Sequence, residues 1–485
     1  MIGILGVALA LGLLIVLAFR GVTVLLLAPA MAVLAAAFDG GMPLLATYTQ
    51  IFMRAAANFI AQFFPLFLLG AVFGKLMEDT GSAEALARGM VAKLGAERSI
   101  LAVVLACAVL TYGGVSLFVV AFAVYPVAAA LFRQADIPKR LIPATIALGS
   151  FTFTMSALPG TPAIPNAIPM PFFGTTAFAA PGLGIIAALV MLGFGLAWLT
   201  WRERSLKAKG EGYGAADGER VKPDKRLREA AQDEGFDLME IGDHPAPPGT
   251  PFPPVWLAAL PVVLVVAVNL IVTAFVIPRL DTAYLAEARF GATDISAVRG
   301  IWAIITGLLV AIVVMVVANR SRLASLARTL DDGANASALP IFNTASLVGF
   351  GAVVASLGAF AAIRDLVLGV GGGSVLISLA FAASVLAGMT GSASGGMTIA
   401  LQSLGATYLE MGRAAGIAPD LLHRVTVVAT GVLDTLPHNG AVITLLAICR
   451  LKHGEAYGDI AMTGMVGPLL SLAVLIGLGS LFGSF

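Results

Sequence analysis

The chain has 485 residues, of which 59% are hydrophobic and only 12% are charged, and its mean hydropathy is +0.95. Soluble domains are usually about 45–50% apolar and about 25% charged, so the composition excludes an ordinary soluble protein. The net charge of +1 says nothing about a partner, and we expect no nucleic-acid ligand. The two cysteines, Cys107 and Cys449, both lie in apolar segments and predict no disulfide framework.

The first part of the chain predicts membrane-spanning helices with two interruptions. A spanning helix needs about 20 mostly apolar residues. The apolar run 99–133 is broken at 111–116 into flanks that are too short to span comfortably, which predicts a re-entrant hairpin with its tip at Gly113-Gly114. A stretch rich in Pro at 158–169 predicts a broken helix. We expect the other helices at 1–19, 22–38, about 56–77, 182–201 and, lying at the interface, 78–98.

Residues 202–254 are different in kind, because they are charged and rich in Gly and Pro with no apolar period. They predict an aqueous linker that is poorly ordered in part. After the linker, apolar segments recur in the same order as in the first half. They predict a hairpin at 371–409, whose small, polar centre is 388–396, and a broken helix at 419–448. Spanning helices are expected at 255–277, 300–318, 338–362 and 460–482.

The two halves share a pattern of helix-breaking residues. Pro65 matches Pro340, Gly113-Gly114 falls opposite Gly391-Ser392, and Leu158-Pro159 matches Leu436-Pro437, at a nearly constant offset. The expected fold is therefore an all-α polytopic membrane protein with two inverted repeats. Each repeat has about five transmembrane helices, a re-entrant hairpin and one broken helix. The expected divisions are 1–201 for the first repeat, 202–254 for the linker and 255–485 for the second repeat.

Charge predicts the orientation in the membrane. With segments placed alternately on the two sides, most of the 29 Lys and Arg residues fall on the side that carries the linker. Loops rich in Lys and Arg stay in the cytoplasm. We therefore expect a cytoplasmic linker, periplasmic termini and a multi-pass protein of the inner, cytoplasmic membrane.

The interruptions are also where chemistry is expected. Ionisable side chains at membrane depth are costly and usually functional, and half-helix ends there expose N–H groups that can hold an anion. Asp434 and His438 lie four residues apart in the second break, and we assign them a proton-coupling role. We predict a substrate site between the two tips and the two breaks. Its candidate residues are Thr111, Tyr112, Gly113, Gly114, Ser116, Thr161, Asn166, Thr390, Gly391, Ser392, Ser394, His438 and Asn439.

Purely structural roles compete with these functional ones. Small residues at the tips also allow close helix packing, Asn166 could serve only to satisfy freed carbonyls, and Asp434 could only cap a half-helix. His423, Arg424 and Arg413, near the outer end of the last broken helix, are expected on a solvated face, with a vestibule as the alternative. The sequence contains no Walker A motif and no metal-ligand cluster, and we expect neither a cofactor nor a metal.

Four segments together carry a family resemblance. They are Leu110-Thr-Tyr-Gly-Gly-Val-Ser-Leu-Phe-Val-Val120, Ala157-Leu-Pro-Gly-Thr-Pro162, Gly391-Ser-Ala-Ser394 and Asp434-Thr-Leu-Pro-His-Asn439. The chain resembles the gluconate permease (GntP-type) family of the ion transporter superfamily. The resemblance implies proton-coupled uptake of a hydroxylated monocarboxylate by a homodimer with a scaffold and a moving transport domain. The chain departs from the gluconate branch in the apolar and small residues around the first tip and in Leu436-Pro437-His438-Asn439, and as a whole it looks more like the 3-hydroxybutyrate permease branch.

The expected function is secondary active symport of a small hydroxy-monocarboxylate, 3-hydroxybutyrate or gluconate-like, with protons. Alternating access of the elevator type is the expected mechanism. A sodium-coupled carboxylate transporter is the alternative, because unwound carbonyls at Gly113-Gly114 and Gly391-Ser392 could coordinate Na⁺. An anion channel and an intramembrane enzyme using Asp434 and His438 remain as further alternatives, although the first half offers no second catalytic carboxylate.

Overall fold

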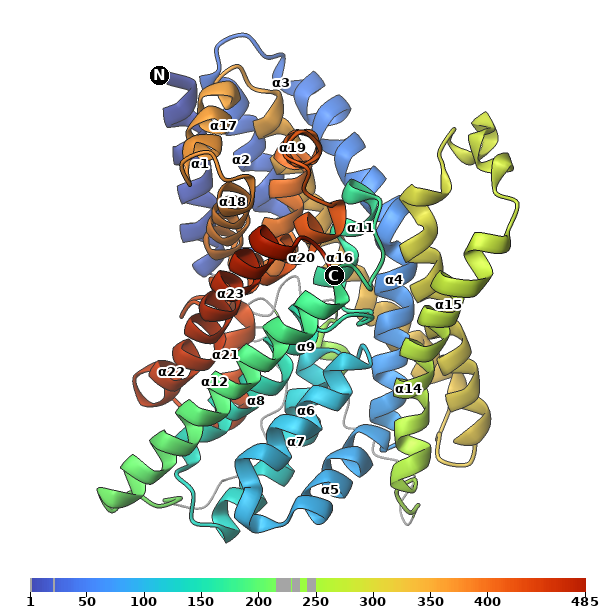
Figure 1. Cartoon of the computed structure of the whole chain (residues 1–485), viewed down its shortest axis with the longest axis vertical. Coiled ribbons are helices and arrows are strands. Elements are labelled where there is room, and N and C mark those ends of the chain that lie inside the picture. Colours follow the sequence, from blue (N-terminus) through green and yellow to red (C-terminus); the bar gives the residue numbers. More distant parts are fainter. Residues whose placement is uncertain (1, 21, 215–227, 229–235, 242–249) are drawn as a thin grey trace.

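The computed structural model describes residues 2–20, 22–214, 228, 236–241 and 250–485. These residues form helices and connecting loops, with no strand among them (Figure 1). Seven of the helices are long and apolar enough to cross a membrane, and the hydropathy of several exceeds 2 over 18 residues. The prediction of an all-α polytopic membrane protein is confirmed.

The first half begins with an antiparallel helix pair and continues through a long helix, a hairpin and a broken helix. The helices are α1 (Ile2–Phe19), α2 (Val24–Phe38), α3 (Leu44–Ala46), η1 (Thr47–Phe52), α4 (Met53–Asp79), α5 (Ser82–Leu94), η2 (Ala96–Arg98), α6 (Ser99–Tyr112), α7 (Leu117–Gln134), η3 (Lys139–Leu141), α8 (Ile142–Ser150), α9 (Phe153–Ser156), α10 (Ile164–Ala167), α11 (Pro169–Phe173) and α12 (Pro181–Ala208).

The second half follows the same order of pair, long helix, hairpin, broken helix and final helix. Its elements are η4 (Leu238–Glu240), α14 (Val255–Ile271), η5 (Val272–Val276), η6 (Ile277–Arg279), η7 (Ala283–Ala286), η8 (Ala288–Phe290), α15 (Ile295–Ala318), α16 (Leu326–Ser356), α17 (Phe360–Gly369), α18 (Val375–Thr390), α19 (Ala393–Ala414), α20 (Pro419–Val432), α21 (Gly440–Cys449), α22 (His453–Ala461), η9 (Met462–Val466) and α23 (Gly467–Phe482).

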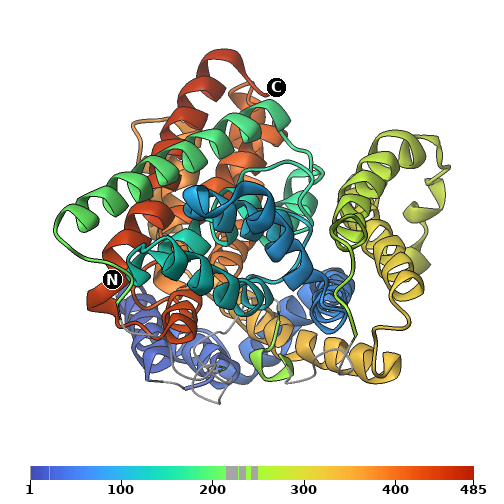
Figure 2. The same ribbon diagram turned by 90° about the horizontal axis from the view of Figure 1, so that it is seen from below.

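The long helices α4 and α16 pack against each other at the centre of the molecule. Gly333 makes their close approach possible, because a Cβ there would lie 2.8 Å from the Cα of Val72. Each helix pair packs on the long helix of the other half: α2 contacts α16, and α15 contacts α4. Figure 2 shows α14 and α15 standing to one side of the remaining helices. The two halves are therefore interleaved and form one body.

A buried ion cluster joins α4 to α16 near the end of α4. The side chain of Lys75 has no exposed surface, and its Nζ lies 3.2 Å from Glu78 Oε2 and 3.1 Å from Asp79 Oδ1. Thr329 of α16 donates its hydroxyl to Asp79 Oδ2 at 2.7 Å. A buried charge needs such partners because its desolvation is costly.

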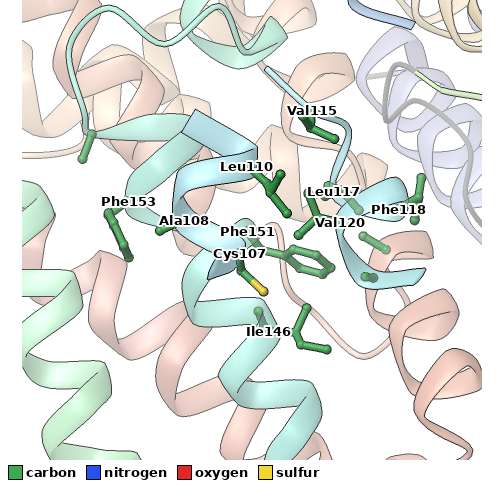
Figure 3. Close-up of a cluster of buried hydrophobic side chains, with 14 of the residues drawn as sticks. Cys107, Ala108, Leu110, Val115, Leu117, Phe118, Val120, Ile146, Phe151 and Phe153 are labelled. Carbon is green, nitrogen blue, oxygen red and sulfur yellow. The ribbon is translucent and has the colours of Figure 1, made fainter. Parts of the chain in front are cut away.

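The first hairpin is α6 and α7, and its tip is residues 113–116. The hairpin packs on α8 and α9 through the cluster of apolar side chains in Figure 3, where Phe151 lies among Cys107, Leu110 and Val120. These side chains are buried, so the arms of the hairpin contact protein. Broken backbone at membrane depth is tolerated under this condition.

The second hairpin is α18 and α19, and its tip is Gly391-Ser392. Its arms are so close that a Cβ on Gly396 would overlap the backbone of Ala387. The tip turns through Gly391, whose φ is +68°, and Ser392 caps α19 by accepting a hydrogen bond from Gly395 N at 3.0 Å. Both re-entrant-like hairpins thus turn at the glycines singled out in the sequence.

The structure corrects two expected helix starts and part of the expected linker. The helix expected at about 56–77 is α4, which begins at Met53 and directly continues the short helices α3 and η1 from Leu44. The helix expected at 338–362 is α16, which begins at Leu326, because polar residues of its first turns find partners there: Arg328 pairs with Asp332, and Thr329 with Asp79. Part of the expected aqueous linker is buried: residues 236–241 pack into the protein, with Phe236 wholly unexposed. Most of the remaining linker, 215–227, 229–235 and 242–249, lies outside the described residues.

Candidate functional site

A cavity of about 60 Å³ lies where the first hairpin tip, the first break, the second hairpin tip and α4 meet. A water needs roughly 10–15 Å³ on this measure, so the cavity has room for on the order of four waters. Its walls combine apolar side chains with small polar groups, and none of the described residues that line it is charged. The lining residues are Leu66, Phe67, Gly70, Thr111, Gly114, Val115, Ser116, Leu117, Met155, Pro162, Ala163, Ile164, Pro165, Ala393 and Ser394.

Two substantial helices begin at the cavity wall. Leu117 is the first residue of α7, which has 18 residues, and Ala393 is the first residue of α19, which has 22. A helix N-terminus carries about half a positive charge, although Ser116 and Ser392 each already accept from one N–H group at these two ends. The cavity therefore favours an anion although its described wall contains no Lys or Arg.

The cavity also holds an unsatisfied hydroxyl. Thr111 is only 3% exposed, and its Oγ1 has no hydrogen-bond partner within the described part of the chain. A buried polar atom of this kind costs about 1–3 kcal/mol unless something pairs with it. Ser116 and Ser394 add two further hydroxyls to the wall, so the site can hydrogen-bond a hydroxyl or carboxylate group.

The other candidate residues of the first half shape the cavity without all reaching it. Gly114 lines it with a φ of +93°, and a Cβ there would lie 2.7 Å from Pro162 Cγ. Gly113 instead faces α14, because a Cβ added to it would lie 2.6 Å from Val262 Cγ1. The Tyr112 hydroxyl donates to the carbonyl of Pro159 at 2.8 Å, which ties the tip to the break.

The second break lies behind the second tip. Asn439 donates its Nδ2 to Gly391 O at 2.8 Å and to Asp434 Oδ1 at 3.1 Å, and it caps α21 by accepting from Ala441 N at 2.7 Å. The Asp434 carboxylate also accepts from the backbone N–H of Ala393, which is a cavity residue. Asp434 is thus one backbone group away from the cavity and is linked to its wall.

His438 and Thr390 also bond to backbone carbonyls at the second hairpin. His438 Nε2 lies 3.0 Å from Gly388 O, and Thr390 donates its hydroxyl to Leu386 O at 2.8 Å. The structure therefore brings Thr111, Gly114, Ser116 and Ser394 together around the cavity. The candidates outside its wall are Tyr112, Gly113, Thr161, Asn166, Thr390, Gly391, Ser392, His438 and Asn439.

The first break is held by a buried polar network. Arg424 and His423 of α20 have no exposed surface. The guanidinium of Arg424 donates to Ser156 O at 3.0 Å, to Ala179 O at 2.7 Å and to Asn166 Oδ1 at 3.1 Å. Arg424 therefore satisfies carbonyls that the unwinding of the helix leaves free.

Asn166 and His423 complete this network. Asn166 donates to Thr161 O at 2.9 Å and to Ala177 O at 3.1 Å. The His423 ring lies between Asn166 Oδ1 at 3.2 Å and Thr175 Oγ1 at 2.6 Å. Both polar atoms of the Asn166 side chain are bonded within the protein, so a structural role for this residue agrees with the geometry.

The expectation that His423 and Arg424 lie on a solvated face was wrong. They face the first break, which is more than 250 residues earlier in the chain, and no helical period within α20 reveals that partner. The cavity residues on α4, Leu66, Phe67 and Gly70, were also missed. For His423 and Arg424 the sequence did contain a signal: two adjacent ionisable residues in an otherwise apolar helix, which at membrane depth need a buried partner.

Comparisons with known proteins agree with the fold of a membrane transporter. The family model described as "GntP family permease" matches residues 2–199. A relative from Bacillus subtilis (strain 168), "Uncharacterized transporter YxjC", is 42% identical over 477 residues, which are 97% of each chain.

Two solved structures share the architecture at low sequence identity. The Alcanivorax borkumensis YdaH transporter has a TM-score of 0.58 at 17% identity, covering 95% of this chain and 97% of its own. The Neisseria gonorrhoeae protein MtrF, described in terms of antimetabolite efflux pumps, has a TM-score of 0.54 at 13% identity and 94% coverage of each chain. At these identities the likeness shows the fold alone. With the relative matching over nearly its whole length, the chain belongs to the GntP permease family and is a membrane transporter.

Proposed function

We propose that this transporter is a proton-coupled symporter of a small hydroxy-monocarboxylate, and that the cavity at the hairpin tips is its substrate site. The observation that carries the proposal is the cavity itself. It joins the N-termini of α7 and α19 to the unpaired hydroxyl of Thr111, without a charged side chain among its described lining residues. Such a wall attracts a carboxylate while binding it weakly enough to release it. The volume of about 60 Å³ is far too small for a sugar acid such as gluconate and is closer to what a short acid such as 3-hydroxybutyrate needs.

Asp434 is our proposed carrier of the coupling proton. Its carboxylate is bonded to Asn439 and to the backbone of Ala393 in the cavity wall. Protonation would weaken the bond from Ala393, because a neutral carboxyl is a poorer acceptor. Proton binding at Asp434 and the conformation of the second tip are therefore coupled.

The proposed mechanism is alternating access of the elevator type in a homodimer. The crossed helices α4 and α16 supply the static part, and the hairpins with the broken helices supply the moving part. In this arrangement the two halves are inverted repeats, 1–201 and 255–485, joined by the linker 202–254. The linker side faces the cytoplasm of the inner membrane, and the termini face the periplasm.

Uptake into proteoliposomes tests the substrate. With an inward proton gradient we expect accumulation of labelled 3-hydroxybutyrate, inhibited by lactate and acetoacetate and much less by gluconate. Gly70→Ala should raise KM severalfold, since the cavity residue Gly70 has open space where the methyl group would enter. Gly193→Ala on the exposed face of α12, also in open space, is the matched control. Equilibration without accumulation would indicate a channel and contradict the proposal.

Asp434→Asn tests the coupling. The amide keeps an oxygen for Asn439 but cannot exchange a proton, so we expect exchange of substrate across the membrane to continue while accumulation driven by a pH gradient is lost. The exposed Asp365→Asn serves as the control. If accumulation in the variant still follows the pH gradient, Asp434 is not the proton carrier. If wild-type accumulation follows a Na⁺ gradient at fixed pH, the sodium-coupled alternative replaces the proton-coupled one.

A further inference from the structure

Residues 236–241 of the linker, here called the docked segment, are built into the core beside α4 and α16. Phe236, Leu238 and Ile241 are 0%, 1% and 7% exposed, whereas Met239 between them is 46% exposed. The segment thus has one apolar face turned into the protein and one face turned outward. A linker that only crossed the solvent between two repeats would leave the apolar side chains of this face exposed.

Polar contacts hold the docked segment at one register. The backbone N–H of Asp237 donates to Ala336 O of α16 at 2.8 Å. The Asp237 carboxylate accepts from Arg228 Nε at 2.8 Å and from the backbone N–H of Met239 at 3.1 Å. Asp237 is itself 4% exposed. These bonds place the preceding residue, Phe236, at a defined point on α4.

The point on α4 that Phe236 contacts is next to the cavity. A Cβ placed on Gly74 would lie 3.9 Å from the Phe236 ring and 3.9 Å from the backbone N of Ser116. Ser116 lines the cavity, and so do Phe67 and Gly70, which share a face of α4 with Gly74 because residues three to four apart lie one above another. Phe236 therefore packs on α4 at Gly74, about one helical turn from the cavity residue Gly70 and on the side of α4 that the first hairpin tip also approaches.

We propose that the docked segment is an intramolecular plug that closes the linker side of the cavity and that must undock for solute to pass on that side. The plug packs on α4 beside the place where the first tip approaches the same helix, so it also opposes sliding of the tip along α4. The bond from Asp237 to α16 and the buried side chain of Leu238 keep the plug in place. This inference rests on the proposed transport role of the cavity, but its test does not depend on transport.

Cysteine accessibility in sealed vesicles tests the plug. Gly70→Cys places a thiol on the cavity wall, and Ala163→Cys provides a second reporter. The native residues Cys107 and Cys449 are unexposed, so the wild-type chain gives the background. A membrane-impermeant methanethiosulfonate is applied to each face in turn, without substrate. Adding Phe236→Ala should speed labelling from the linker face at least tenfold, whereas Met239→Ala, in the same segment but exposed, should leave the rate unchanged.

The labelling rates at the two reporters decide whether the docked segment closes the cavity. Equal rates with and without Phe236→Ala at both reporters overturn the inference, as does an increase confined to the face opposite the linker. If Phe236→Ala fails to elute as the wild type does in gel filtration, Asp237→Ala replaces it, since this change keeps the phenyl ring but removes the carboxylate that Arg228 holds. If the protein does not transport hydroxy acids but still shows the labelling increase, the plug is supported and only the proposed substrate is wrong.

Discussion

Replacing Arg424 by methionine is expected to abolish uptake and to lower the apparent melting temperature of the purified protein. The change leaves the carbonyls of Ser156 and Ala179 without the guanidinium as their donor, at a cost of about 1–3 kcal/mol for each buried acceptor, and leaves Asn166 Oδ1 with His423 alone. The first break would lose the shape that presents Pro162 to the cavity. Uptake into proteoliposomes and thermal unfolding in detergent measure the two effects.

Two further variants identify the cause of the Arg424 effect. Arg424→Lys keeps the charge but lacks the planar fork that reaches several acceptors at once, so an intermediate melting temperature is expected. Arg413→Met removes an exposed arginine from the end of α19 and should change neither quantity. If Arg424→Met unfolds and transports as the wild type does, the network does not hold the break.

Gly114→Ala is expected to lower kcat/KM for uptake at least tenfold. Gly114 has a φ of +93°, a conformation that costs a non-glycine residue about 1–3 kcal/mol. The new methyl group would also meet Pro162 Cγ at 2.7 Å, so that the first tip and the first break must move apart. Because both line the cavity, their separation changes the site directly.

The control for Gly114→Ala is another glycine beside a broken helix. Gly431 lies near the end of α20, and a Cβ there would meet only Ser156 Oγ, at an ordinary distance of 3.9 Å. Gly431→Ala should therefore keep nearly wild-type uptake. If Gly114→Ala transports like Gly431→Ala, the close contact between tip and break is not needed in the transport cycle.

The sequence alone was enough to predict the class of protein and the position of each interruption. Apolar length predicts spanning helices because lipid offers no partner for backbone groups, and glycine and proline mark where those helices stop. The tips at Gly113-Gly114 and Gly391-Ser392 and the break after α20 are local consequences of these residues, and they were located correctly. The membership of the GntP permease family followed from the same segments.

Other features depend on contacts between distant segments. Asn439 next to Gly391 and Asp434 could be anticipated as part of one motif, but the partnership of Arg424 with Ser156 and Ala179 could not. Nor does the linker composition reveal that Phe236 is buried against Gly74, because three apolar residues among charged ones have no period long enough to detect.

Composition and helix-breaking residues by themselves determined that this chain is a membrane transporter with two hairpin tips and two broken helices. Only the tertiary structure decided which of those polar residues face the cavity, which hold the backbone in place and which part of the linker enters the core. The physical reason is that helix formation and membrane insertion depend on neighbouring residues along the chain. The pairing of a buried charge or an unwound carbonyl depends on what the fold brings within about 3 Å of it.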